Sequence, residues 1–351
     1  MIKMLKRKGF ARGVVLVALI ATFSTLIANI PEIKNLGISP LVVGILLGII
    51  FGNTLHYKLG QDMDSGITFS AKKILRFAIV FYGFRITFQE ILSVGMEGFL
   101  VSLIMLASTF IIGIWIGVKV FKMDRDLSIL NASGASVCGA AAVLATEPVL
   151  DSEGYKAAIA VSMVVLFGTI AMFLYPALYL SVFEPSTGFL HLDPHQFGIY
   201  VGGTIHEVAQ VIAVPASVPN ASKEMSDAAV IVKMTRVMMI APLLIILGLY
   251  LSIKSSEGSK KAVKVVIPWF AVYFIGVAGF NSLNLLPKNI VDSINMIDTF
   301  LLTMAMTALG IGTKFANFKG LGGAPIYTAL IMFIWLIVGG FIVTKLLTSG
   351  F

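Results

Sequence analysis

Charged residues are scarce in this chain of 351 residues. Only 13% are Asp, Glu, Lys or Arg, whereas hydrophobic residues make up 58%. Soluble domains usually carry about 25% charged residues. A soluble fold this apolar would expose large hydrophobic patches and aggregate. The composition therefore excludes an ordinary soluble protein and predicts a membrane protein.

Cysteine and the common catalytic motifs are also nearly absent. Cys138 is the single cysteine, which excludes an intramolecular disulfide. The string His206-Glu207-Val-Ala-Gln210 has glutamine where a zinc protease motif needs its second histidine, and no nucleophile elbow or phosphate-binding loop is present. The net charge of +8 arises from Lys and Arg at the ends of apolar runs, as in membrane loops, which argues against nucleic acid. We expect no enzyme activity, cofactor or metal site.

What the chain does contain is a series of apolar runs, and a spanning helix needs about 20 mostly apolar residues. Two segments, about 126–146 and 196–214, are apolar but rich in glycine, serine and polar groups. The pattern predicts an all-α polytopic membrane protein, 1–351 being one transporter domain with about eleven membrane segments. The nine ordinary runs are 11–29, 38–53, 71–89, 96–120, 157–182, 227–252, 265–281, 294–311 and 323–346.

The distribution of Lys and Arg predicts the orientation, because cytoplasmic loops carry an excess of both. The N-terminus is expected in the cytoplasm, since it carries Lys3, Lys6, Arg7, Lys8 and Arg12. Other cationic loops, expected on the same side, lie near 54–76, 119–125, 254–264 and 314–319. An odd number of crossings then places the C-terminus outside.

The two polar segments resemble each other. Gly134–Ala145 aligns without gaps on Gly202–Ala213, and Ser136 falls on Thr204. Membrane segments use few residue types, so similar strings also arise by chance. However, interrupted segments of internal repeats line the substrate site in many secondary transporters. We therefore expect inverted repeats over about 38–182 and 196–346.

Two topologies remain open for these segments. If both span, the chain crosses eleven times; if both are re-entrant hairpins, nine helices cross. The loop 183–196 has no Lys or Arg, which favours an outside location and hence the hairpins. Both segments are nevertheless long enough to span, and on that ground eleven crossings are the favoured prediction.

The first polar segment is a candidate anion site. Gly134 and Gly139 weaken the helix locally, and backbone amides freed at a helix start bind anions without a cationic side chain. Close helix packing through small residues is the alternative. The residues expected to contact substrate are Asn131, Ser133, Gly134, Ser136, Cys138 and Gly139.

The second polar segment contains ionisable groups inside an apolar run, which is the usual mark of a functional site in a membrane. Burial favours the neutral form of a carboxyl group, so Glu207 is a candidate proton carrier. Histidine ordinarily titrates near neutrality, so His206 is another. A structural ion pair with a neighbouring helix is the alternative. Gly203, Thr204, His206 and Gln210 are expected to line the second side of the substrate site.

Three cationic residues lie within or near the apolar runs. Arg85 follows Tyr82-Gly83-Phe84, and Lys233 and Arg236 share one face of a helix because they are three residues apart. Each is a candidate to neutralise an anionic substrate or to pair with Glu207, and arginine suits bidentate oxyanion binding. Snorkelling of these side chains to the membrane surface is the alternative.

At these motifs the sequence resembles the sulfate exporter family of bacterial inner-membrane proteins. The residues that carry the resemblance are Phe81-Tyr-Gly-Phe-Arg85, Gly134-Ala-Ser-Val-Cys-Gly139, Thr204-Ile-His-Glu-Val-Ala-Gln210 and Lys233-Met-Thr-Arg236. The resemblance implies ten or eleven helices and a distant similarity to the cation–proton antiporter and bile-acid symporter group, whose inverted repeats carry broken helices. This sequence has Ala135-Ser136 where the family often has two hydroxyl residues.

The leading hypothesis is a secondary transporter that exports a small anion, of the sulfate, sulfite or organosulfonate class, by alternating access. Its expected partners are the anion, the lipid bilayer and protons or sodium as coupling ions, with a homodimer left open. A cation–proton antiporter, with Glu207 as the cation ligand, is the second hypothesis. A channel or an intramembrane enzyme is a third.

Overall fold

The computed structural model describes residues 9–31, 33, 40–55, 61–254, 269–314, 316 and 322–348. These residues form helices and no strands, so the all-α prediction is confirmed for the described part of the chain. Many of the cations behind the predicted orientation lie outside the described residues: Lys3, Lys6, Arg7, Lys8, Lys58, Lys260, Lys261, Lys264 and Lys319. The orientation of the two termini stays a prediction.

Long apolar helices dominate the described residues. By length and composition, the helices that could cross a membrane are Phe10–Ala28, Val94–Val120, Gly154–Phe183, Lys223–Leu251, Lys288–Gly312 and Gly323–Thr348. Shorter apolar helices cover Pro40–Thr54, Ala140–Leu150 and Val272–Ser282. The polytopic class is therefore supported, whereas the count of about eleven membrane segments stays a prediction.

The chain divides into two compact units. Unit 1 contains Met1–Ser93, Ile212–Lys223 and Trp269–Lys319. Its helices and short 3₁₀ or π segments are α2 (Phe10–Ala28), α4 (Pro40–Thr54), η1 (Gln61–Met63), α6 (Asp64–Phe69), η2 (Ser70–Ile74), α7 (Leu75–Tyr82), η3 (Gly83–Arg85), α16 (Trp269–Ser282) and α17 (Lys288–Gly312). Among the described helices, α8 (Phe88–Trp115), which is kinked at Gly95, and α13 (Val208–Ala216) have residues in both units, and the first residue of α14 (Lys223–Met238) also belongs to unit 1.

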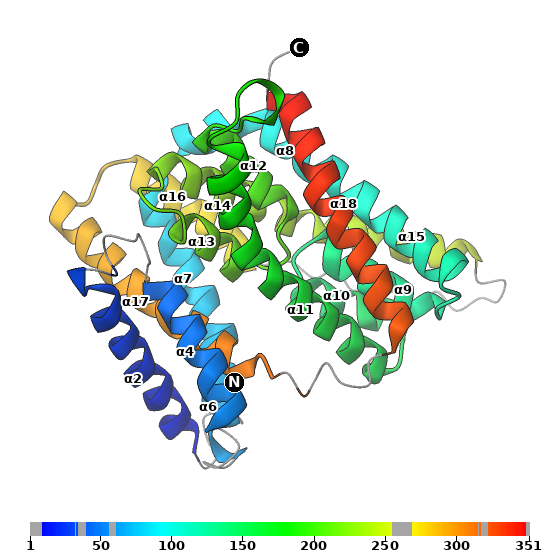
Figure 1. Cartoon of the computed structure of the whole chain (residues 1–351), viewed down its shortest axis with the longest axis horizontal. Helices are drawn as coiled ribbons and strands as arrows, with labels where there is room; N and C mark the ends of the chain where they lie inside the picture. The colour runs from blue at the N-terminus through cyan, green and yellow to red at the C-terminus, as the bar shows by residue number, and fades with distance from the viewer. Residues whose placement is uncertain are drawn as a thin grey trace. The chain divides into compact units, whose positions relative to one another are not determined.

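Unit 2 contains Val94–Val211, Glu224–Pro268 and Gly320–Phe351. Its elements are η4 (Ile116–Val120), α9 (Arg125–Ser136), α10 (Ala140–Leu150), α11 (Gly154–Leu178), η5 (Tyr179–Phe183), η6 (Gly188–Leu190), α12 (Pro194–Thr204), α14 (Lys223–Met238), α15 (Ile240–Lys254) and α18 (Gly323–Thr348). Within this unit α18 packs along α9, α11 and α12, and α9 packs along α11 (Figure 1).

In unit 1, α17 is the central helix, packed against α4, α2, η2 and α7. Its contact with α4 is close because glycines Gly44, Gly48 and Gly52 recur every fourth residue along one face of α4. A side chain at Gly48 would overlap the carbonyl oxygen of Thr307 in α17, and one at Gly310 would overlap that of Ile45. Small residues at this spacing let helix backbones approach in a membrane.

The first polar segment consists of α9 and α10. The chain enters this segment and leaves it at the same end of the neighbouring helix α11. Asp124 caps α9 through the amides of Asp126 and Leu127, and Lys156 at the start of α11 lies 2.9 Å from the Asp124 carboxylate. The bond from Lys156 keeps the pKa of Asp124 below its ordinary value, so the pair is charged at neutral pH. Because α9 and α11 begin side by side, the geometry favours a re-entrant hairpin over a spanning segment.

The second polar segment, α12 with α13, follows the same plan from the other end of α11. The amide of Leu192 donates to the carbonyl of Phe183, just beyond α11, and Asp193 caps α12. His195 at the start of α12 lies 3.3 Å from Glu224 at the start of α14. The two helices run in the same direction, since Gly198 lies against Met225 and Gly202 against Ala229. This segment also begins and ends at the same end of the unit, as the re-entrant alternative requires, and the number of membrane crossings stays a prediction.

Candidate functional site

Both polar segments are broken at the positions that the sequence alignment pairs. The first helix ends at Ser136 and resumes at Ala140; the second ends at Thr204 and resumes at Val208. Each break leaves main-chain carbonyls at the end of one helix and amides at the start of the next without helical partners. A membrane interior supplies no water to satisfy them, so the protein has to provide donors and acceptors.

Two cationic side chains of α14 provide the donors for both breaks. Lys233 Nζ lies 2.8 Å from the carbonyl oxygen of Val137 and 2.7 Å from that of Ile205. Arg236 donates to the carbonyls of Ser136 at 2.7 Å, Gly203 at 2.5 Å and Ala135 at 3.0 Å. Both side chains are fully buried, at 0% exposure. They therefore tie the end of α9 to the end of α12.

The sign of the charge suits this position. The C-terminal end of a helix carries partial negative charge, which a nearby cation stabilises. Lys233 and Arg236 face two such ends at once. Snorkelling to the membrane surface, the alternative considered for these residues, does not describe side chains that are fully buried.

Glu207 is the last residue of the second break, directly before α13. Its Oε1 is 3.5 Å from the amide nitrogen of Ala140, the first residue of α10. This approach depends on Gly139, which has a φ of 74° and where a side chain would overlap Cγ of Glu207. The amide of Glu207 donates in turn to Oε1 of Gln210 at 3.1 Å. A carboxylate thus occupies the helix N-terminus at which the sequence predicted an anion.

The remaining polar residues of the breaks bond mainly to their own helices. The hydroxyls of Ser133, Ser136 and Thr204 donate to the carbonyls of Leu130, Ser133 and Tyr200. Asn131 donates to the carbonyl of Pro325 at the start of α18, at 3.3 Å. Each of these hydroxyls keeps lone pairs, but its proton is already directed at the backbone. These three hydroxyls are therefore weaker as donors to a substrate than their residue types indicate.

Two further predicted site residues are buried at the breaks. Cys138 is a free thiol between α9 and α10, and His206 lies between α12 and α13 with 3% exposure. Nδ1 of His206 has no hydrogen-bond partner among the described residues, and the imidazole lies 6.4 Å from the Phe333 ring. Gly134 packs against Val164 and Gly203 against Val101, as the close-packing alternative requires.

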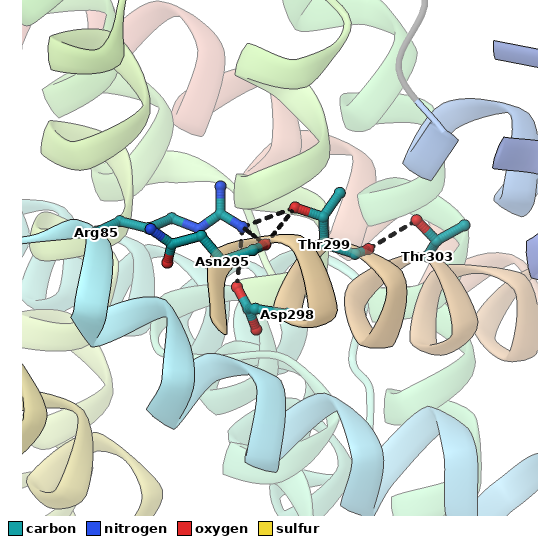
Figure 2. A network of polar contacts seen from close by, with 5 residues as sticks. All are labelled: Arg85, Asn295, Asp298, Thr299 and Thr303. Carbon is teal, nitrogen blue, oxygen red and sulfur yellow. Dashed lines mark hydrogen bonds and ion pairs between the residues drawn. The ribbon is translucent and has the colours of Figure 1, made fainter. Parts of the chain in front are cut away.

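Arg85 belongs to a different cluster, in unit 1. Its described contacts join η3 to α17, where it pairs with Asp298 at 3.2 Å and donates to Thr299 and to the carbonyl of Asn295, both at 2.7 Å (Figure 2). The guanidinium also lies over the Tyr82 ring. Sequence reasoning named Arg85 but missed Asp298. The signal was available, because Asp298 is an acidic residue inside the apolar run 294–311.

Comparisons with known proteins assign the chain to a family of membrane proteins. The family model described as conserved hypothetical protein 698 matches residues 12–329. A UPF0324 membrane protein of Pseudomonas putida is 45% identical over 97% of this chain and 94% of its own. The UPF0324 inner membrane protein YeiH of Escherichia coli K12 is 44% identical over 94% of this chain and 92% of its own. The chain therefore belongs to the conserved hypothetical protein 698 family, whose relatives here are UPF0324 membrane proteins.

Proposed function

We propose that the protein is a secondary transporter that moves a small anion, of the sulfate, sulfite or organosulfonate class, out across the bacterial inner membrane by alternating access. The supporting observation is the pair of fully buried cations, Lys233 and Arg236, at the meeting point of two broken helices. Broken helices inside a membrane are tolerated where they line a cavity or pack in protein, and they form the substrate sites of many transporters.

Charge balance supports an anion as the substrate. The side chains that contact the breaks include two cations and one carboxylate, Glu207. Lys233 and Arg236 direct donors at the backbone, so their role is to fix the breaks and to supply a positive field. The amides at the starts of α10 and α13 are then the groups suited to contact an anion.

Glu207 provides a physical link between the anion and a proton. Its carboxylate lies beside the first amide of α10, so it competes with an anion for the same helix N-terminus. Protonation removes the negative charge and frees this position for the substrate. An anion and a proton would therefore bind together, which couples their movement across the membrane.

The test is transport in proteoliposomes that contain the purified protein. We expect saturable uptake and counter-exchange of radiolabelled sulfate or a sulfonate, with a dependence on the pH gradient that Glu207→Gln abolishes. Glu224→Gln is the matched control, because Glu224 is an exposed carboxylate at the start of α14. If Glu207→Gln keeps the pH-gradient dependence of the control, the coupling role is wrong; flux that neither saturates nor counter-exchanges indicates a channel.

A cation–proton antiporter is the second candidate, because the donors of Lys233 and Arg236 are already engaged by carbonyls and a carboxylate such as that of Glu207 can bind a cation. Thermal unfolding of the purified protein distinguishes the two. Stabilisation by sulfate or sulfonates without a response to sodium supports anion transport. The reverse pattern supports the antiporter.

A further inference from the structure

A polar cluster within unit 1 shares no residue with the proposed transport site, whose residues belong to unit 2. It consists of Arg85 from η3 and Asn295, Asp298, Thr299 and Thr303 from α17 (Figure 2). Asp298 is fully buried, at 0% exposure, inside a helix apolar enough to span a membrane. A carboxylate in such a position is costly unless it is fully paired or takes up a proton.

The ion pair with Arg85 gives the Asp298 carboxylate only one long hydrogen bond. One nitrogen, Nη2, approaches three acceptors: the carbonyl of Asn295 at 2.7 Å, Oγ1 of Thr299 at 2.7 Å and Asp298 Oδ2 at 3.2 Å. This nitrogen carries only two protons, and the two short bonds go to neutral acceptors. A strong bond between a guanidinium and a carboxylate measures about 2.7–2.9 Å. Arg85 is therefore held in place whether or not Asp298 is charged.

The other carboxylate oxygen indicates where a proton would bind. Oδ1 of Asp298 is turned away from Arg85 (Figure 2), and it has no hydrogen-bond partner among the described residues. Oδ1 of Asn295 is also buried without a partner in the described part of the chain. The two residues are three positions apart and so share one face of α17. A proton on Oδ1 of Asp298 would remove the buried negative charge at an oxygen that accepts no hydrogen bond from the described residues.

The charged groups around α17 leave Arg85 as the partner of Asp298. The helix α4 has no ionisable side chain between Pro40 and Thr54. Arg12 of α2, Lys72 and Lys73 of η2, Arg76 of α7, and Lys288 and Asp292 of α17 are exposed, and Asp64 of α6 is half-buried. In the described part of unit 1, Arg85 is the one charged group in contact with Asp298. The guanidinium would repel a metal cation at the same carboxylate but leaves room for a proton.

We infer that Asp298 is a proton-binding site, which takes up and releases a proton while Arg85 stays anchored to the backbone and hydroxyl of α17. The ligand is the proton itself. The site lies within unit 1 and does not rest on the anion or on the role of Glu207. It adds Asp298 to the candidate proton-binding groups, for which the sequence indicated Glu207 and His206.

Infrared spectroscopy of the full-length protein in lipid nanodiscs tests this inference without any transported substrate. A protonated carboxylic acid has a carbonyl stretching band that an ionised carboxylate lacks. We expect such a band in the wild type, lost as the pH is raised from mildly acidic to alkaline. Asp298→Asn should lack that component, whereas Asp292→Asn, a change of an exposed carboxylate on the same helix, should keep it.

A second variant keeps the test independent of the folding of Asp298→Asn. Arg85→Gln removes the nearby positive charge that favours the ionised form. The Asp298 band should then persist to higher pH than in the wild type. An unchanged band in Asp298→Asn, or a titration that Arg85→Gln does not shift, overturns the proposal.

Discussion

At the scale of single residues, Lys233 donates hydrogen bonds to carbonyls that the two helix breaks expose. Lys233→Met keeps the length of the side chain but removes the donor for the carbonyls of Val137 and Ile205. A buried carbonyl left without a donor costs about 1–3 kcal/mol. We therefore expect this variant to unfold at a clearly lower temperature than the wild type, as followed by tryptophan fluorescence in detergent.

The control for this change is Lys119→Met, which removes an exposed lysine from the same unit. Substitutions at exposed positions usually change stability by less than about 0.5 kcal/mol. Equal unfolding temperatures for the two variants would show that the breaks do not need Lys233. Loss of stability in Lys233→Met alone supports the arrangement in which one cation holds both helix ends.

The residue types of this site could be read from the sequence, but their partners could not. Glu207, Lys233 and Arg236 stand out because they are ionisable groups inside or beside apolar runs. Nothing in the sequence indicates that both cations face main-chain carbonyls, because backbone groups have no sequence signature. Asp298 was missed although it meets the same criterion as Glu207, since no resembling motif surrounds it.

At the scale of elements, the contact between α4 and α17 depends on the absence of side chains. Gly48→Ala would place a methyl group against the carbonyl oxygen of Thr307 and the backbone of Gly310. Overpacking of a closely packed interface typically costs about 1–3 kcal/mol. We expect the variant to unfold at a lower concentration of denaturing detergent, with helix content followed by circular dichroism.

Gly276→Ala is the matched control within the same unit. A methyl group at Gly276 in α16 would meet no atom of the described residues within 4 Å, apart from the adjacent backbone of its own helix. Alanine in a helix interior is favoured over glycine by about 0.5–1 kcal/mol, so this variant should be as stable as the wild type or slightly more stable. If both variants behave alike, the backbone approach of α4 and α17 does not contribute to stability.

The positions of the helix breaks are the element-scale feature that the sequence predicted best. The gapless alignment pairs Ser136 with Thr204, and these residues end α9 and α12. The match has a physical basis, because glycine weakens a helix and the backbone groups freed at a break need polar partners inside a membrane. The alignment could not predict that each polar segment begins and ends at the same end of the unit. That arrangement depends on contacts between distant residues, such as Lys156 with Asp124.

At the scale of the whole molecule, the hairpins determine on which side of the membrane each loop lies. If α9 and α10 form a re-entrant hairpin, the chain before α9 and the chain before α11 lie on the same side. If the segment spans, they lie on opposite sides. This relation does not depend on the absolute orientation of the protein, which rests on cationic residues near the termini and in the loops. The ion pair of Lys156 with Asp124 favours the first arrangement.

Cysteine labelling can decide between the two arrangements, because Cys138 is the single native cysteine and Cys138→Ala gives a cysteine-free background. Cysteines are then introduced one at a time at the exposed positions Lys119, Glu153 and Thr187. With a membrane-impermeant maleimide on intact and permeabilised cells, we expect Lys119→Cys and Glu153→Cys to react from the same side. Thr187→Cys should react from the opposite side, because α11 crosses the membrane between them. Opposite accessibility of Lys119→Cys and Glu153→Cys would instead establish that the first polar segment spans, as the prediction of eleven crossings requires of both polar segments.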